Sequence, residues 1–75
     1  MKKVINIHIT RGEKNYVAES FDLPIVTQAK TLDELMVNVR EAVELALDGG
    51  DAELYDVVQN PSIVANIVVD NPEYV

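Results

Sequence analysis

Hydrophobic and polar residues alternate at the start of the chain, and a period of two predicts a half-buried β-strand. The apolar members are Ile5, Ile7 and Ile9, and the polar members are Asn6, His8 and Thr10. The polar segment Arg11 to Asn15 contains a glycine and predicts a hairpin loop of about five residues. A returning strand is expected over Tyr16 to Phe21, which is rich in aromatic and β-branched residues.

A proline separates the second predicted strand from the third. Leu23-Pro24 is expected to end the second strand, because proline lacks a backbone N–H and holds the preceding residue extended. Ile25 to Ala29 is then predicted as a third, short strand. A helix is predicted from Leu32 to Leu47, since Thr31 can cap its N-terminus and Glu34 follows at the spacing of a capping box.

The predicted helix is amphipathic, and its apolar stripe is expected to cover the sheet. The stripe consists of Leu32, Leu35, Met36, Val39, Ala42, Val43, Ala46 and Leu47. Gly49 and Gly50 are expected to end the helix, since glycine accepts the left-handed conformation beyond a helix C-terminus. Asp51 to Gln59 predicts a weak, short second helix with Asp51 as its candidate N-cap. The apolar residues expected to share a face of this second helix are Leu54, Val57 and Val58.

The last strand is predicted from Ser62 to Asp70, after a break at Asn60-Pro61. It is apolar on both faces, with Ile63, Ala65, Ile67 and Val69 on one face and Val64 and Val68 on the other. Such a strand is usually covered on both faces, whereas one helix covers only one face. The strand is therefore expected either to be central in the sheet or to be covered by another subunit. The tail Asn71 to Val75 is expected to be loosely held.

These elements define the expected fold class. A helix between two strands of one sheet favours a right-handed crossover, which places the last strand parallel to the first, beside the hairpin. We therefore expect an α+β domain of β-β-β-α-β order, one sheet with one main helix packed on one face. A chain of 75 residues is enough for one such domain over residues 1–75. No separate DNA-binding domain is expected.

Composition narrows the choice of function. The chain has no cysteine, which excludes disulfides and thiolate metal sites and permits a cytoplasmic location. No apolar run approaches the roughly 20 residues that span a bilayer. The net charge of −7, from thirteen acidic and six basic residues, argues against binding to nucleic-acid phosphates. It favours either simple solubility or association with a basic partner.

A series of short motifs occurs in order between residues 16 and 42. They are Tyr16-x-Ala18, Asp22-Leu23-Pro24, Thr27, Thr31-x-x-Glu34, Asn38 and Glu41-Ala42. In this order and spacing they resemble the HicB-type antitoxin family, including stand-alone HicB-like domains of unassigned role. The resemblance covers Val4 to Leu47 and implies a truncated ribonuclease H-like β-β-β-α-β fold. Ile25 and Ala29 stand where that family usually has glycine, so the turn and the helix entry are expected to differ locally.

The resemblance implies that the chain is an antitoxin-like protein-binding module. Its partner would be a small basic toxin, a HicA-like ribonuclease, whose RNA-binding or active surface the module covers. No basic recognition helix follows Leu47, so no direct nucleic-acid binding by this chain is expected. The alternative is a stand-alone homo-oligomeric HicB-like domain with another, non-catalytic role.

Catalysis is not expected. Two-metal phosphodiester cleavage needs clustered carboxylates, and Lys3 to Thr10 contains no acid. Glu19 and Asp22 are better interpreted as a solvent-facing strand residue and a turn residue. His8, the only histidine, is expected to face away from the main helix and has no evident partner for proton transfer. Asp48 to Glu53 resembles a calcium loop but lacks its ligand spacing, so neither a metal nor a cofactor is expected.

The candidate contact residues for a partner or for another copy of the chain are Glu19, Asp22, Val37, Glu41, Leu45, Val64 and Val68. Val37 and Leu45 lie on the otherwise polar face of the predicted helix, four residues to either side of Glu41. Scattered exposed apolar residues are normal and need no cause. The sharper interpretation is a contact stripe, for a partner or for a second copy.

Overall fold

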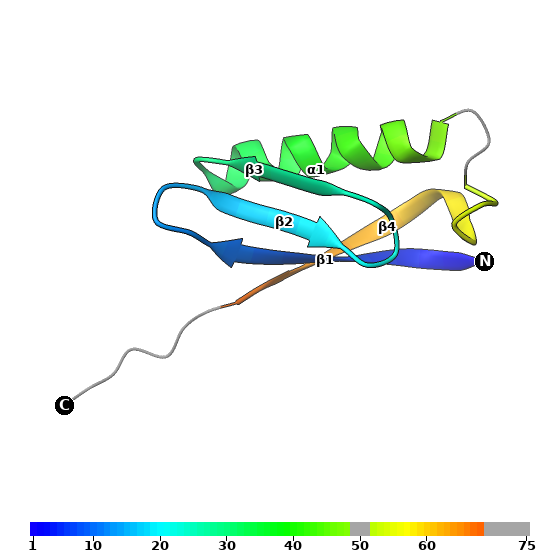
Figure 1. Cartoon of the computed structure of the whole chain (residues 1–75). Coiled ribbons are helices and arrows are strands. Elements are labelled where there is room, and N and C mark those ends of the chain that lie inside the picture. Colours follow the sequence, from blue (N-terminus) through cyan, green and yellow to red (C-terminus); the bar gives the residue numbers. More distant parts are fainter. Residues whose placement is uncertain (49–51, 69–75) are drawn as a thin grey trace.

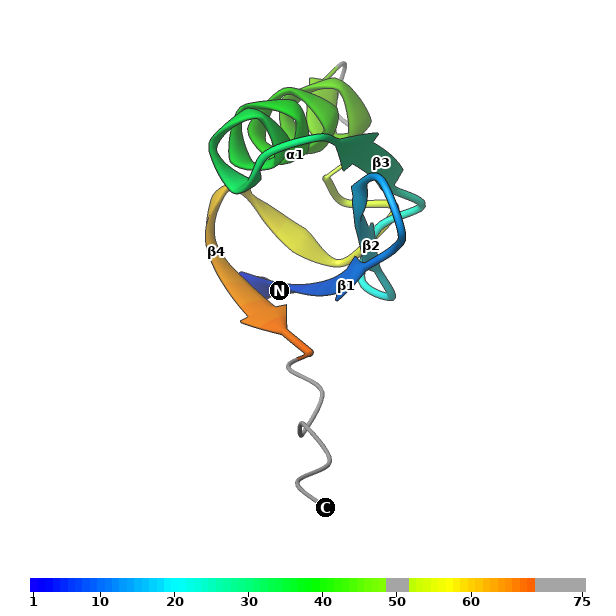
Figure 2. The same ribbon diagram turned by 90° about the vertical axis from the view of Figure 1, so that its left-hand side faces the viewer.

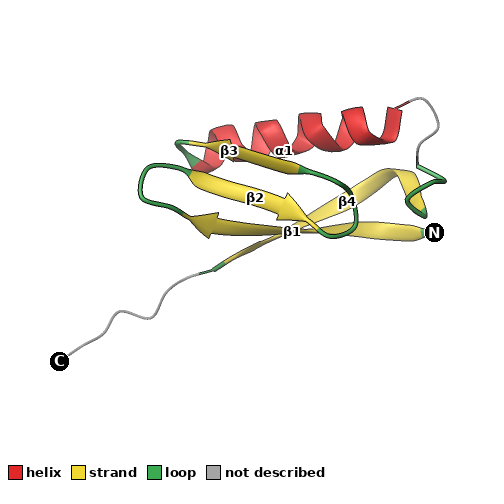
Figure 3. Cartoon of the chain, in the orientation of Figure 1, coloured by secondary structure: helices red, strands yellow, loops and turns green. Residues whose placement is uncertain are grey.

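The computed structural model describes residues 1–48 and 52–68 of the chain. Its elements follow in the order β1 (Lys2–Arg11), β2 (Tyr16–Ser20), β3 (Val26–Ala29), α1 (Leu32–Leu47) and β4 (Val57–Ile67). Figure 1 shows α1 lying along one face of a single sheet, and Figure 3 shows the same elements coloured by type. The predicted α+β class and the β-β-β-α-β order are confirmed. No helix in the described part of the chain is long and apolar enough to cross a membrane.

The four strands lie in the order β3-β2-β1-β4. β1 and β2 are antiparallel, as are β2 and β3, whereas β4 runs parallel to β1. The parallel placement beside the hairpin is the one that the crossover predicted. Two alternatives were open for the last strand, a central position in the sheet or cover by another subunit. The central position is wrong, because β4 lies at an edge of the sheet. Figure 2 shows α1 over the face of the sheet, next to β3, and β3 forms the edge opposite β4.

Two turns join the first three strands. The loop after β1 is closed by a hydrogen bond of 2.8 Å from the Gly12 N–H to the Asn15 carbonyl. A Cβ atom at Gly12 would lie 3.2 Å from that carbonyl oxygen, so a glycine suits this close approach. After β2, the Ile25 N–H donates to the Leu23 carbonyl at 2.8 Å, forming a tight turn centred on Pro24. The Ile25 side chain is only 4% exposed and fills part of the core.

Helix α1 has the predicted bounds. The Thr31 hydroxyl accepts a hydrogen bond of 3.2 Å from the Glu34 N–H, as an N-cap residue does. The buried residues of the helix recur every four positions and are Leu35, Val39, Val43 and Leu47. The other members of the predicted stripe pack against the core as partly buried residues. The stripe is therefore confirmed, while the expected helix stop at Gly49-Gly50 lies outside the described residues.

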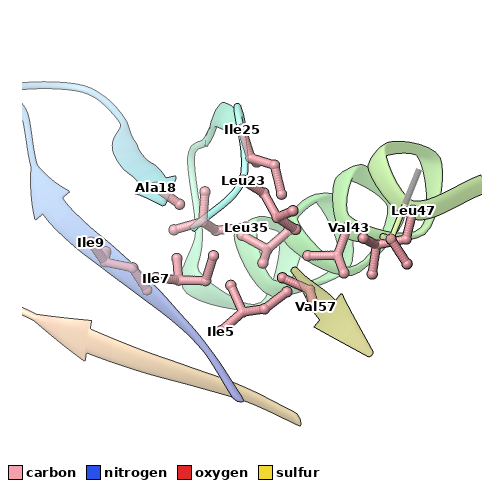
Figure 4. Close-up of a cluster of buried hydrophobic side chains, with 12 residues drawn as sticks. Ile5, Ile7, Ile9, Ala18, Leu23, Ile25, Leu35, Val43, Leu47 and Val57 are labelled. Carbon is pink, nitrogen blue, oxygen red and sulfur yellow. The ribbon is translucent and has the colours of Figure 1, made fainter. Parts of the chain in front are cut away.

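The core lies between α1 and the face of the sheet that it covers. Ile5, Ile7 and Ile9 of β1 are at most 1% exposed and point toward the helix (Figure 4). Leu35 and Val43 of the helix point back toward them. Burying each such side chain contributes about 1.5 to 3 kcal/mol to stability. The alternation along β1 therefore determines which face of the sheet receives α1.

The second helix expected over Asp51 to Gln59 is not present in the described part of that range. Instead, the Val57 N–H donates to the Ala52 carbonyl at 3.0 Å and the Asp56 N–H donates to the Glu53 carbonyl at 3.2 Å. Asp56 has a φ of 56°, in the left-handed region. This combination is the Schellman motif that closes a helix. The segment is thus a single closed turn, and Asp51 lies outside the described residues.

β4 begins at Val57, five residues before the predicted start at Ser62. Val57 lies beside Lys2 and Ser62 lies beside Val4, so five steps along β4 match two along β1. Pro61 falls within this irregular part, where a missing N–H breaks no regular ladder. The predicted break at Asn60-Pro61 is therefore a bulge inside one strand. The part of the predicted strand beyond Val68, and the predicted tail, lie outside the described residues.

Candidate functional site

Asp22 lies just past the end of β2. On that side β1 extends further than β2 and has no neighbouring strand. Its carboxylate accepts the Asn6 backbone N–H at 2.9 Å and the Lys2 ammonium group at 3.0 Å. The Ser20 hydroxyl donates to the Asn6 carbonyl at 3.0 Å and accepts the Asp22 N–H at 3.1 Å. The turn thus satisfies both backbone groups of Asn6, which would otherwise lack partners.

These contacts also determine the charge of Asp22. The backbone hydrogen bond from Asn6, followed by that from Lys2, lowers the pKa of the Asp22 carboxyl below its usual value of 3.8. The side chain is only 17% exposed. Asp22 therefore holds the turn against β1, as a turn residue would. No group of three or more His, Asp or Glu side chains within residues 1–48 and 52–68 is placed to hold a metal ion.

Glu19 lies on the open face of the sheet, the face opposite α1. It is exposed and stands between His8 of β1 and Val26 of β3 in the sheet register. His8 is also on this face, as predicted, and is partly covered by Phe21. The two ring centroids are 5.2 Å apart and the ring planes are tilted by 54°.

Val64 and Val68 lie on the same open face, at the edge formed by β4. Val64 stands beside Asn6 in the register, and the two valines are 43% and 54% exposed. The sequence prediction missed three further exposed apolar residues on this face, Val4, Phe21 and Val26, which are 42%, 81% and 72% exposed. The alternation of β1 already places Val4 on the face of Asn6 and His8. Nothing in the pattern indicates that Phe21 turns back over His8.

Val37, Glu41 and Leu45 lie on the outer face of α1, away from the sheet. Val37 is 56% exposed and Leu45 is 75% exposed. At about 100° per residue, the same face carries further exposed acidic residues, which are Asp33, Glu34 and Glu44. A shallow hollow of about 480 Å³ adjoins Leu45 and is lined by Glu41, Glu44 and Asp48. The predicted contact stripe on the outer face of α1 is thus an exposed acidic surface that contains two apolar side chains.

The predicted contact residues do not form one site. Val37, Glu41 and Leu45 are on the outer face of the helix, while Glu19, Val64 and Val68 are on the open face of the sheet. Helix and sheet lie between the two groups (Figure 1). Asp22 belongs to neither, because its carboxylate is used within the fold. A compact partner can therefore contact one group or the other, and each surface needs its own occupant.

A groove between α1 and the irregular part of β4 was also missed. It has a volume of about 470 Å³ and is lined in part by Met36, Arg40, Val43, Pro61 and Ile63. At its end, the Gln59 side-chain amide donates to the Leu47 carbonyl at 3.0 Å and so satisfies a terminal carbonyl of the helix. The groove exists because α1 packs on β2 and β3 more than on β4.

Comparisons with protein families, with curated proteins and with solved structures found no significant match to this chain.

Proposed function

We propose that this chain is an antitoxin-like protein-binding module that neutralises a small basic RNA-cleaving toxin by covering its RNA-binding or active surface. The observation that carries the proposal is the outer face of α1, where exposed acids surround the exposed Val37 and Leu45. The motifs shared with HicB-type antitoxins support the same role. The module is proposed to act in the cytoplasm, without catalysis, metal or cofactor.

The charges of α1 support a basic partner. The helix contains the acids Asp33, Glu34, Glu41 and Glu44 and a single base, Arg40. Arg40 lines the groove toward β4, as Glu44 also does, so four acids face one base on the exposed part of α1. Opposite charge speeds the encounter of two proteins and aligns them. Carboxylates along one helix can pair with the cationic groups through which a ribonuclease would otherwise bind RNA phosphates.

The two exposed apolar residues, Val37 and Leu45, supply binding affinity that charge alone does not. Rim charges mainly affect the association rate and its salt dependence, whereas affinity depends on a few side chains that become fully desolvated. Val37 and Leu45 are two helical turns apart on the outer face, with Glu41 between them. We place them at the centre of the contact and the acids around it.

The test is inhibition of RNA cleavage by a purified HicA-like toxin in the presence of this chain, at low and at moderate salt. Inhibition is expected at low salt and is expected to weaken as salt screens the charges. The variant Glu41→Lys/Glu44→Lys should lose most of the inhibition. The control Glu13→Lys/Glu53→Lys changes net charge equally at exposed positions away from α1 and should keep it. No inhibition at low salt, or equal loss in both variants, would refute the proposal.

The alternative is a stand-alone homo-oligomeric domain with another, non-catalytic role. A different observation favours it, namely the exposed and uncharged edge strand β4. Self-association without any effect on the toxin would support this alternative.

A further inference from the structure

The edge strand β4 carries no charged residue along its whole length. Its residues Val57–Ile67 include no Asp, Glu, Lys or Arg, in a chain with thirteen acids and six bases. Natural edge strands are usually protected from pairing by charges, prolines or bulges. Pro61 and the register shift protect the first part of β4. Residues 62–68 have none of these protections.

The direction of the free backbone groups follows from one hydrogen bond. The Val68 N–H donates to the Ile9 carbonyl of β1 at 3.0 Å. Successive residues of a strand direct their N–H and C=O groups to opposite sides. Ile63, Ala65 and Ile67 therefore direct these groups outward, away from β1. The same alternation makes Asn6 of β1 point toward β2, as its contacts with Ser20 and Asp22 require.

We propose that this edge pairs with the same edge of a second copy of the chain. The two β4 strands run antiparallel across a two-fold axis at Ala65, and the two four-stranded sheets become one continuous sheet. Both α1 helices then lie on the same face of that sheet. The proposal does not depend on the proposed toxin binding, because it uses β4 and leaves the outer face of α1 free.

The outward positions are self-complementary. Ile63, Ala65 and Ile67 have the same residue types when read from either end, as a two-fold interface requires. Ala65 meets the partner's Ala65, and Ile63 meets the partner's Ile67. Each of these pairs can exchange two backbone hydrogen bonds. The small alanine lies on the axis, where the two chains are closest.

Burial and charge favour a second copy over a basic partner at this edge. Ile67 is 47% exposed on the helix side of β4, and Val64 is 43% exposed on the open side. Pairing would bring the partner's strand against these side chains and reduce their exposure. Two copies with a charge of −7 each repel one another, so they approach most readily along an uncharged strip. A basic protein would gain nothing from that strip and more from α1.

A cysteine at the axis tests the geometry directly. The natural chain has no cysteine, so Ala65→Cys introduces a single thiol. Residues directly opposite in a hydrogen-bonded antiparallel pair have Cα atoms about 5.5 Å apart, within the range for a disulfide of about 4.4 to 6.8 Å. Mild oxidation of Ala65→Cys is expected to give a covalent dimer. Val37→Cys, at an exposed position on α1, is the control and should stay largely uncoupled.

Charge at the axis tests the association itself, measured by analytical ultracentrifugation. The wild type is expected to be dimeric at micromolar concentrations, whereas Ala65→Lys and Ala65→Glu should each be monomeric and folded, because Ala65 is exposed. Mixing the two variants should restore dimers, since opposite charges then meet at the axis. Val37→Lys should remain dimeric. A monomeric wild type, a dimeric Ala65→Lys, or a mixture that stays monomeric would overturn the proposal.

Discussion

The carboxylate of Asp22 and the backbone N–H of Asn6 are joined by a hydrogen bond of 2.9 Å, at the point where β1 extends past the end of β2. The turn formed by the Asp-Leu-Pro motif is thereby fixed to the first strand. Lys2 adds an ion pair of 3.0 Å to the same carboxylate. An aspartate at this position has a role in folding that does not require a partner protein.

Asp22 is therefore expected to matter for stability. Asp22→Ala leaves the Asn6 N–H without its acceptor, and losing a hydrogen bond to a charged group costs about 1.5 to 3 kcal/mol. Asp22→Asn keeps an acceptor but loses the charge, so a smaller loss is expected. Urea unfolding at pH 7, followed by circular dichroism, measures both variants. Equal stability of Asp22→Ala and the wild type would show that the turn holds without this contact.

The same carboxylate should contribute to acid sensitivity. The pKa of Asp22 in the folded chain is lowered, mainly by the Asn6 N–H and then by Lys2, whereas an unfolded aspartate keeps the usual value of 3.8. A lowered folded-state pKa gives stability that is present above the unfolded value and is lost as the pH falls through the folded value. As the pH falls from neutral through the unfolded value, the wild type should lose more stability than Asp22→Asn. A parallel decline of the two proteins in urea titrations would contradict this assignment.

Asp56 supports a third prediction, from backbone strain. Its φ of 56° is left-handed, a conformation that costs an ordinary residue about 1 to 2 kcal/mol and glycine almost nothing. Asp56→Ala should therefore be less stable than Asp56→Gly by about 1 kcal/mol. The ion pair of Asp56 with the Met1 amino group is 3.6 Å long and exposed, and both variants remove it. Thermal unfolding of the two measures the backbone effect, and equal melting temperatures would contradict it.

The sequence pattern was sufficient to predict the elements that are specified by one buried face. The alternation of Ile5, Ile7 and Ile9 and the spacing of Leu35 to Leu47 follow directly from burial against each other. The helix start at Thr31 follows from a local cap. In each case the residues that specify the element are neighbours in sequence or repeat at a fixed period.

The start of β4 could not be predicted in this way. Leu54, Val57 and Val58 fit a helical face as well as a strand, and Pro61 has the sequence signature of a break. The outcome depends on Asp56 adopting a left-handed conformation and on the pairing of Val57 with Lys2. That pairing joins residues 55 positions apart, which local propensity does not encode.

The separation of the candidate surfaces was also beyond the sequence. Both surfaces contain exposed apolar residues near acids, so composition alone did not distinguish them. The order of the strands places Val64 and Val68 at an edge, while the phase of the helix places Val37 and Leu45 on the far side. Only the assembled fold shows that one partner cannot cover both.

The inner and outer faces of α1 provide the last prediction, with Leu35 and Val37 as a matched pair. Leu35 is fully buried and Val37 is 56% exposed, two residues apart in one helix. Leu35→Ala leaves a cavity and should cost about 2 to 5 kcal/mol. Val37→Ala removes little buried surface, and alanine has the better helix propensity, by up to about 0.7 kcal/mol. Its stability should therefore be equal to or slightly above that of the wild type in urea unfolding.

The value of this pair lies in separating folding from binding. If Val37 serves a partner, Val37→Ala should weaken toxin inhibition while leaving the unfolding midpoint unchanged. A destabilisation of Val37→Ala as large as that of Leu35→Ala would mean that Val37 packs within the domain, and the outer face of α1 would no longer be free for a partner.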